Sequence, residues 1–218
     1  MGDNRVFIVG DIHGCLGMLE RLMEKVSWQP ERDQLIFLGD YIDRGGNSKG
    51  VVDYLVELKR SSPNVQFIIG NHEVMLLDYL AGRNRDLYFA NAGHTTLRSY
   101  MEARPVGEEV LIPQEHMEFY YSLKPYIEAE DYYVVHAGFR PGVDPREQTL
   151  EDMVWIREPF IYSDYDFGKK VIFGHTPFQR PLVMENKFGL DTGAVYGNRL
   201  TCLELPEIIF HSVEAKGF

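Results

Sequence analysis

Side chains that bind metal ions recur at five places in the sequence, each directly after a short apolar run and beside a glycine. The five segments are Gly10–Gly14 (GDIHG), Gly39–Gly45 (GDYIDRG), Gly70–Glu73 (GNHE), His136–Gly138 (HAG) and Gly174–Pro177 (GHTP). One such segment alone is a weak signal, because Gly-Asp is common in turns and a single histidine is more often a core residue than a ligand. Five in succession, each at the end of an expected strand, indicate one shared site.

The types of these side chains fit a site for two cations. Asp11 and His13 are two residues apart, so in extended backbone they point to the same side and can bind one ion together. Asp40 has two carboxylate oxygens and could bridge two ions. An amide oxygen and two imidazoles would complete the coordination of the second ion, from Asn71, His136 and His175. Oxygen and nitrogen donors without thiolate suit Mn, Fe, Zn or Co, and we expect two divalent ions, with Mn²⁺ preferred.

The elements that must position these residues follow from the apolar pattern. Short runs rich in Val, Ile and Phe predict strands at Val6–Val9, Leu35–Leu38, Val65–Ile69, Tyr132–Val135, Val171–Phe173, Leu200–Leu205 and Glu207–Ser212, the last two paired across Pro206. Apolar steps of three and four predict helices over 16–26, 51–58, from Glu73 onward, and more weakly over Thr95–Met101 and Gln114–Leu123. Strands that alternate with helices are typical of an α/β fold. Ligands of such folds bind at the carboxyl ends of strands, so the polar segments should converge on one crevice.

Composition narrows the class of protein. The 218 residues, 44% of them hydrophobic, can build one α/β domain over residues 1–218, and we expect it to act as a monomer. No run approaches the ~20 apolar residues that cross a bilayer, and the first residues lack a signal-peptide pattern, so we expect a cytoplasmic protein without a membrane partner. The net charge of −11 would repel polyanions, so nucleic acid is not an expected partner. With only two cysteines, Cys15 and Cys202, a disulfide framework is not expected.

The motifs resemble those of the phosphoprotein phosphatase branch of the calcineurin-like metallophosphoesterases. GDIHG, GDYIDRG and GNHE occur in the order typical of that family. Further matches extend over nearly the whole chain: VVHAG at Val134–Gly138, VWIRE at Val154–Glu158, IFGHTP at Ile172–Pro177 and DTGA at Asp191–Ala194. The sequence is most similar to compact lambda-phage-type and bacterial serine/threonine protein phosphatases, and next to symmetrical diadenosine tetraphosphate hydrolases. The resemblance implies two central mixed β-sheets sandwiched between helices.

The resemblance also implies roles for individual residues. It makes His72 the general acid and Asp43 the carboxylate that holds its imidazole, since a nearby carboxylate favours the protonated form. Arg44 and Arg157 would bind the phosphoryl oxygens, where a planar guanidinium offers two parallel hydrogen bonds. The implied ligands of the first metal ion are Asp11, His13 and Asp40, and those of the second are Asp40, Asn71, His136 and His175.

The implied reaction is hydrolysis of a phosphomonoester, with a phosphorylated protein as the expected partner, by direct in-line attack of metal-activated water. The alternative is a hydrolase of symmetrical dinucleoside polyphosphates, a small phosphate-containing substrate, that would use the same residues. The negative charge disfavours a nuclease, and the intact metal and acid set disfavours a non-enzymatic binding module. Specificity is expected to depend on loops at Arg83–Tyr88, Arg104–Glu109 and Phe139–Thr149.

A few residues outside these roles have two possible interpretations or no assigned role. Asp191 could orient a metal-bound histidine or cap a turn. Cys15 could be a redox-sensitive thiol, but a small hydrophobe at the start of a helix is preferred. Tyr196 matches no aromatic contact of the family and is given no role. Three histidines match no metal motif, and surface or core positions are preferred for them: His94, His116 and His211.

Overall fold

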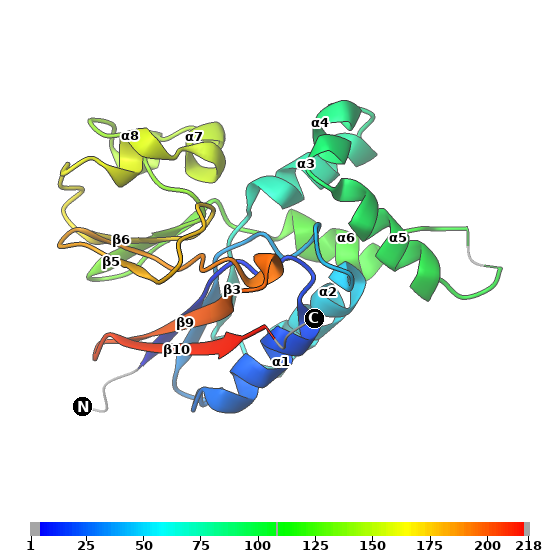
Figure 1. The fold of residues 1–218 in the computed structure, drawn as a ribbon, viewed down its shortest axis with the longest axis horizontal. Coiled ribbons are helices and arrows are strands. Elements are labelled where there is room, and N and C mark those ends of the chain that lie inside the picture. Colours follow the sequence, from blue (N-terminus) through cyan, green and yellow to red (C-terminus); the bar gives the residue numbers. More distant parts are fainter. Residues whose placement is uncertain (1–4, 108, 216–218) are drawn as a thin grey trace.

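Two five-stranded β-sheets pack against each other at the centre of the computed structural model, which describes residues 5–107 and 109–215 (Figure 1). The first sheet has the strand order β10-β9-β1-β2-β3 and the second β4-β5-β6-β8-β7. Parallel strands in the first sheet are β1 (Val6–Val9), β2 (Gln34–Phe37) and β3 (Val65–Phe67), and its antiparallel strands are β9 (Arg199–Leu205) and β10 (Ile209–Glu214). Parallel strands in the second are β5 (Tyr132–Val135), β6 (Lys170–Phe173) and β8 (Lys187–Gly189), and its antiparallel edges are β4 (Tyr126–Glu128) and β7 (Leu182–Val183).

Helices cover the outer face of each sheet and give the molecule four layers (Figure 1). The first sheet is covered by α1 (Leu16–Lys25), α2 (Ser48–Ser61), α3 (Asn71–Leu80), α4 (Arg85–Ala90), α5 (Gly93–Ala103) and α6 (Gln114–Tyr121), all of which contribute to one core. The second sheet is covered by α7 (Leu150–Trp155) and α8 (Glu158–Ile161). Two short 3-10 helices are η1 (Pro145–Glu147) and η2 (Ala194–Tyr196). Within the described ranges, no helix is long and apolar enough to span a membrane.

Alternation along the central strands explains why their sequences are apolar throughout. In β1, Phe7 and Val9 face the helices, whereas Val6 and Ile8 pack between the sheets. The same alternation in β6 directs Val171 toward α7 and α8 and Ile172 toward the first sheet. A strand that is buried on both faces has no polar side, so it reads as a continuous apolar run.

The expected two-sheet α/β fold is confirmed, with differences at short elements. The last strand does pair with β9, but it is displaced to Ile209–Glu214, because residues 206–208 form the turn. Helix α3 begins at Asn71 rather than Glu73. The loop expected at Arg83–Tyr88 is wrong in part, since α4 begins at Arg85 and buries Tyr88. The short elements β4, β7, β8, α7 and α8 were not expected, because they span too few residues to show a period.

Candidate active site

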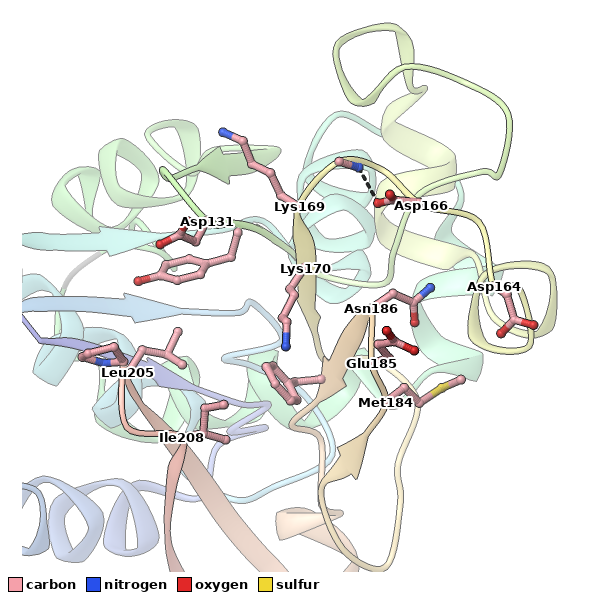
Figure 2. A pocket seen from close by; sticks show the side chains of 14 residues that line it. Asp131, Asp164, Asp166, Lys169, Lys170, Met184, Glu185, Asn186, Leu205 and Ile208 are labelled. Atoms are coloured by element: carbon pink, nitrogen blue, oxygen red, sulfur yellow. Dashed lines mark hydrogen bonds between the residues drawn. The ribbon is translucent and has the colours of Figure 1, made fainter.

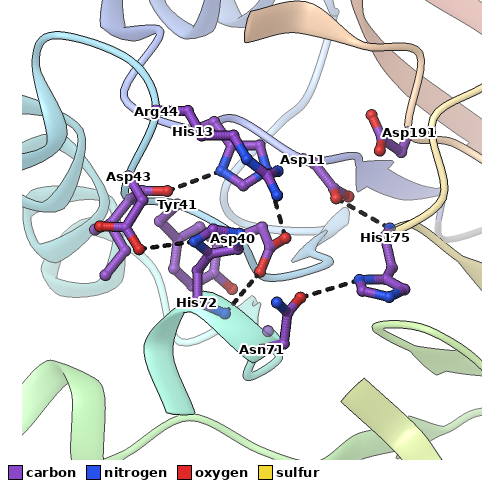
Figure 3. Close-up of polar contacts among 12 residues, drawn as sticks. Asp11, His13, Asp40, Tyr41, Asp43, Arg44, Asn71, His72, His175 and Asp191 are labelled. Atoms are coloured by element: carbon purple, nitrogen blue, oxygen red, sulfur yellow. Dashed lines mark hydrogen bonds and ion pairs between the residues drawn. The ribbon is translucent and has the colours of Figure 1, made fainter. Parts of the chain in front are cut away.

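The polar segments meet where the parallel strands of both sheets end (Figure 3). Asp11 and Asp40 follow β1 and β2, Asn71 opens α3, and His136 and His175 follow β5 and β6. All five side chains are nearly inaccessible to solvent. Convergence of the two sheets on one edge therefore brings together donors that are far apart in the sequence.

Several site residues hold backbone conformations that side chains disfavour. His13, Asp40, Asp43, Arg44 and His175 have φ between 47° and 67°, in the left-handed region. Each such residue costs about 1 kcal/mol or more and persists only when its surroundings over-determine it. The strain is concentrated at the candidate site, as is common where side chains must be held in one geometry.

One group of donors surrounds Asn71. The ligand atoms of Asp40, His136 and His175 all lie within 4.8 Å of one another. Asn71 Oδ1 is 3.1 Å from His136 Nε2 and 3.0 Å from His175 Nδ1. His136 Nδ1 is 2.8 Å from the Leu38 carbonyl oxygen, a contact that directs Nε2 into the group. Four donors in this arrangement could hold one cation.

The second group of donors lies on the other side of Asp40. Asp40 Oδ2 is 3.4 Å from His13 Nε2, while its Oδ1 is 3.4 Å from His136 Nε2, so one carboxylate faces both groups. His13 Nδ1 is 2.8 Å from the Ile42 carbonyl oxygen, which leaves Nε2 as the ligand atom. Asp11 Oδ2 accepts a hydrogen bond from the His175 backbone N–H at 2.9 Å. Among the described residues, Asp11 Oδ1 is buried without a hydrogen-bond partner. A buried carboxylate oxygen without a partner is costly, and a cation would satisfy it.

Electrostatics of the site also fit bound cations. Burial, with Asp191 and Asp40 nearby, raises the pKa of Asp11 well above its usual value. Burial lowers the pKa of His13 to about 3 and that of His175 to about 2, so both imidazoles are neutral and have a lone pair for a metal. Burial acts to lower the pKa of His136, but the Asp40 carboxylate outweighs it and raises that pKa to about 9. Clustered buried carboxylates and neutral imidazoles are the environment that divalent ions stabilise.

His72 and Asp43 form a fully buried pair beside the metal-binding groups. His72 Nδ1 is 2.7 Å from Asp43 Oδ2, and neither side chain is exposed. The other ring nitrogen, Nε2, has no hydrogen-bond partner among the described atoms, and the His72 ring packs edge-on against His13 at 4.7 Å. His72 also lies close enough to His13 and Asp40 to be a further ligand by distance alone. Its Nδ1 is engaged by Asp43, so only Nε2 is available for either role.

The two arginines lie next to residues of the candidate site. Arg44 Nη1 is 2.5 Å from His13 Nε2, and its guanidinium lies 5.7 Å from the Tyr196 ring centroid. Arg157 donates a hydrogen bond to Thr176 Oγ1 at 3.3 Å, next to His175. Arg157 also lines a cavity of about 610 Å³ together with residues of α7 and α8. Both guanidiniums could therefore reach an anion bound near the donor groups.

Glu73 supports the site in a way that its sequence motif did not predict. It is fully buried, and it accepts hydrogen bonds from the backbone N–H groups of Asp40, Tyr41 and Gly70 at 2.9 to 3.0 Å. The carboxylate thus ties the Asp40 loop to the start of α3. A glutamate three residues after a helix N-cap was the available signal, because it is typical of a capping box.

The residues with open readings are resolved mostly toward structural roles. Asp191 Oδ1 accepts the Gly193 backbone N–H at 2.9 Å, which supports the turn cap. Cys15 packs on the main core, and burial raises its thiol pKa to about 11, which disfavours a reactive thiolate. His116 bonds to the Tyr100 hydroxyl, His211 contacts Glu204, and His94 is exposed.

A cavity of about 900 Å³ lies elsewhere in the described structure (Figure 2). It opens at the starts of β5 and β6, the opposite ends of the strands from the donor groups. Its lining mixes carboxylates with Lys169 and Lys170, and none of the expected site residues lines it. Lys169 is already paired with Glu128. Chemistry, rather than cavity size, identifies the site.

Comparisons with known proteins give the same picture. The family model described as calcineurin-like phosphoesterase matches residues 4–202. PrpE of Bacillus thuringiensis, named an asymmetrical bis(5'-nucleosyl)-tetraphosphatase, is 30% identical over 226 residues, which cover 92% of this chain and 90% of that protein. Serine/threonine-protein phosphatase 1 of Salmonella typhimurium is 30% identical over 200 residues, which cover 90% of this chain and 89% of that protein.

Solved structures share the fold. The crystal structure of a protein put forward as a diadenosine tetraphosphatase superposes with a TM-score of 0.78 at 25% identity, covering 100% of this chain and 96% of that one. A protein serine/threonine phosphatase of Saccharomyces cerevisiae superposes with a TM-score of 0.71 at 16% identity, covering 99% of this chain and 81% of that one. The sequence resemblance placed symmetrical tetraphosphate hydrolases next after the protein phosphatases, whereas PrpE is named for asymmetrical cleavage.

Proposed function

The chain belongs to the calcineurin-like phosphoesterase family, and from this membership we propose that it is a phosphomonoester hydrolase acting on phosphoserine and phosphothreonine in proteins. The phosphoester hydrolase class comes from the family, and the leaving group is what the proposal adds. The observation that carries it is the buried His72–Asp43 pair beside the metal-binding donors.

The donor groups described above are the proposed ligands of two divalent ions. Asp11, His13 and Asp40 hold one ion, and Asp40, Asn71, His136 and His175 hold the other. Two ions bound there supply Lewis-acid stabilisation of phosphoryl charge and lower the pKa of water, with Mn²⁺ as the preferred metal. Asp40 belongs to both donor groups, because one of its carboxylate oxygens faces His13 and the other faces His136.

The remaining site residues act on the substrate. Arg44 and Arg157 bind and orient the phosphoryl oxygens by charge-assisted hydrogen bonds. Asp43 accepts the hydrogen bond from His72 Nδ1 and so fixes the orientation of the imidazole, with Nε2 left for the substrate. As the oxygen of a water molecule forms its bond to phosphorus in line with the ester oxygen, the bond from phosphorus to that ester oxygen breaks, and the Nε2 proton passes to the departing oxygen.

The leaving group distinguishes a phosphoprotein from a nucleotide polyphosphate. A serine or threonine alkoxide is a strong base and leaves poorly unless it receives a proton as it departs. A nucleotide phosphate is a weak base, which leaves without that help. A buried acid with its own carboxylate partner is therefore most useful on an alcohol leaving group.

A comparison of substrates tests the proposal. We expect Mn²⁺-loaded protein to turn over a phosphoserine peptide faster than a bis(5'-nucleosyl) tetraphosphate. The variant His72→Asn should lower kcat on the peptide about 10²–10⁴-fold, the usual contribution of a general acid, and lower p-nitrophenyl phosphate turnover much less. Equal losses on both substrates, with Mn²⁺ binding intact, would remove His72 from the proposed role.

The second candidate is hydrolysis of bis(5'-nucleosyl) tetraphosphates. It is favoured by the similarity to PrpE over nearly the full length of both chains. The same ligands and arginines would serve it, so the two candidates differ in whether the leaving group needs the proton of His72. Faster tetraphosphate turnover, with little loss in His72→Asn, would select this candidate.

A further inference from the structure

The Asp43 carboxylate is held from two sides, and only one of them is the His72 pair. Asp43 Oδ1, the oxygen that does not face His72, accepts the Thr96 hydroxyl at 2.6 Å and the Tyr88 hydroxyl at 3.1 Å. Tyr88 belongs to α4 and Thr96 to α5, and both side chains are fully buried. Neither helix contributes a residue to the donor groups described above.

Thr96 fixes the backbone of Asp43 as well as its carboxylate. The Asp43 backbone N–H donates to Thr96 Oγ1 at 2.9 Å and to Ser48 Oγ at 3.1 Å, and Ser48 Oγ lies 3.0 Å from the Thr96 hydroxyl. A hydroxyl has one proton and accepts two hydrogen bonds, so Thr96 has one proton for Asp43 and no spare capacity. Asp43 has φ of 67°, a strained value that this double contact helps to maintain.

Tyr88 reaches Asp43 only because its neighbour is small. A Cβ atom at Gly93, the first residue of α5, would lie 2.5 Å from atoms of the Tyr88 ring. Burial, with the nearby Asp43 charge, raises the pKa of Tyr88 far above the usual tyrosine value, so the phenol remains a proton donor. The α4–α5 segment is thus packed so that one hydroxyl from each helix meets the same oxygen.

We propose that Thr96 and Tyr88 are positioning residues for proton transfer, acting through Asp43 on the orientation of His72. The inference rests on the proposed function, in which His72 donates a proton to the leaving oxygen. Without the two hydroxyls, Asp43 would lose both hydrogen bonds to Oδ1 and one of the two acceptors of its backbone N–H, and the imidazole would sample orientations away from the leaving oxygen. This positioning of His72 should matter most for substrates with poor leaving groups, which need a proton as they depart.

The test compares two aryl phosphates with the Mn²⁺-loaded protein. Phenyl phosphate has a poor leaving group, whereas the nitro group of p-nitrophenyl phosphate stabilises the departing phenolate without a proton. In Thr96→Val we expect the ratio of phenyl phosphate to p-nitrophenyl phosphate turnover to fall about tenfold, as for loss of one hydrogen bond to a charged group. Tyr88→Phe, which keeps the ring in place, should lower the ratio a few-fold because its bond is longer. Thr96→Ser, which keeps the hydroxyl, should restore the wild-type ratio.

Two controls separate positioning from folding and from the proposed function. Tyr100→Phe removes a buried hydroxyl from α5 that bonds His116 and Tyr120 but not Asp43, and its ratio should equal that of wild type. His72→Asn, which removes the proposed acid itself, should give the largest fall in the ratio of phenyl phosphate to p-nitrophenyl phosphate turnover. If His72→Asn lowers the ratio and neither Tyr88→Phe nor a folded Thr96→Val does, the positioning roles are overturned while the proposed function stands. If His72→Asn leaves the ratio unchanged, the acid role falls and the positioning proposal with it.

A spectroscopic measurement supplies a readout that does not depend on turnover. The proton between His72 Nδ1 and Asp43 Oδ2 is buried and should give a resolved downfield signal in the ¹H NMR spectrum of the metal-free protein. We expect the signal to shift in Tyr88→Phe and Thr96→Val and to stay in place in Tyr100→Phe. An unmoved signal in both test variants would contradict the proposal.

Discussion

Replacement of Glu73 by glutamine should destabilise the protein far more than the loss of one charge suggests. Its carboxylate accepts three backbone N–H groups, those of Asp40, Tyr41 and Gly70, at a fully buried position. The amide of glutamine has one acceptor oxygen, and its NH₂ group would face at least one of these N–H donors. A buried N–H without an acceptor costs about 1–3 kcal/mol, and the remaining bonds lose their charge assistance.

The N–H left without an acceptor costs about 1–3 kcal/mol, and relief of the buried charge offsets part of that cost, because burial and the Asp40 carboxylate raise the Glu73 pKa and so disfavour its ionised form. We expect a net loss of about 1–2 kcal/mol in the free energy of unfolding for Glu73→Gln. For a chain of this size, each kcal/mol lowers Tm by about 2–4 °C, so Tm should fall by roughly 2–8 °C. Glu73→Ala, which leaves all three N–H groups without an acceptor, should lose more. Because the carboxylate also holds the Asp40 loop, the affinity for Mn²⁺ should fall as well.

Thermal unfolding followed by circular dichroism, on metal-free protein at pH 8, measures the stability term without the metal. Burial, with the Asp40 charge, raises the Glu73 pKa to about 7, so at pH 8 the wild-type side chain is mainly ionised. Glu24→Gln makes the same chemical change at an exposed position of α1 and should alter stability by less than about 0.5 kcal/mol. A Tm within about 2 °C of wild type for Glu73→Gln would refute the hydrogen-bond argument.

Three further predictions concern the glycine contacts, the metals and the acid limb of stability. Gly174→Ala should weaken Mn²⁺ binding in calorimetric titrations, because an added Cβ would overlap Asp11 Oδ1, and an unchanged affinity would contradict the proposed role of Asp11 as a ligand. As a control, Gly17→Ala in α1 places its Cβ in open space and should stabilise the fold by about 0.5 kcal/mol. Mn²⁺ at about 100 times its Kd should stabilise the folded state by about 3 kcal/mol, so a Tm that does not rise with Mn²⁺ would argue against a metal centre. Burial acts to raise the pKa of Asp33, but hydrogen bonds from Arg5 and the Gln29 N–H outweigh it and hold the pKa below its usual value. The stabilisation by the Asp33 carboxylate should therefore be complete above about pH 5 and fade below about pH 4. The difference in Tm between wild type and Asp33→Asn should become smaller as the pH is lowered. A difference that does not change with pH would show that protonation of Asp33 does not contribute to acid unfolding.

The sequence by itself determined the class of fold and the chemical types in the site. Strands buried on both faces must be apolar throughout, so β1, β2 and β6 could be located from composition alone. Ligand chemistry requires carboxylate, amide and imidazole donors, and the strand-end motifs display them directly. Short elements such as β7 and α8 could not be located, because two to four residues carry no periodic signal.

Only the tertiary structure decided how the expected bridging carboxylate is oriented and which groups hold the site in place. The sequence marks Asp40 as a carboxylate that could bridge two ions, but only the packing of the two sheets at one edge turns one of its oxygens toward each donor group. Glu73 acts through backbone N–H groups, which every residue has, so its partners leave no mark in the sequence. Thr96 and Tyr88 contact Asp43 from helices that begin more than 40 residues after it in the sequence. Nothing in the local sequence marks a threonine or a tyrosine for this role, which becomes visible only when packing brings both hydroxyls to one carboxylate oxygen.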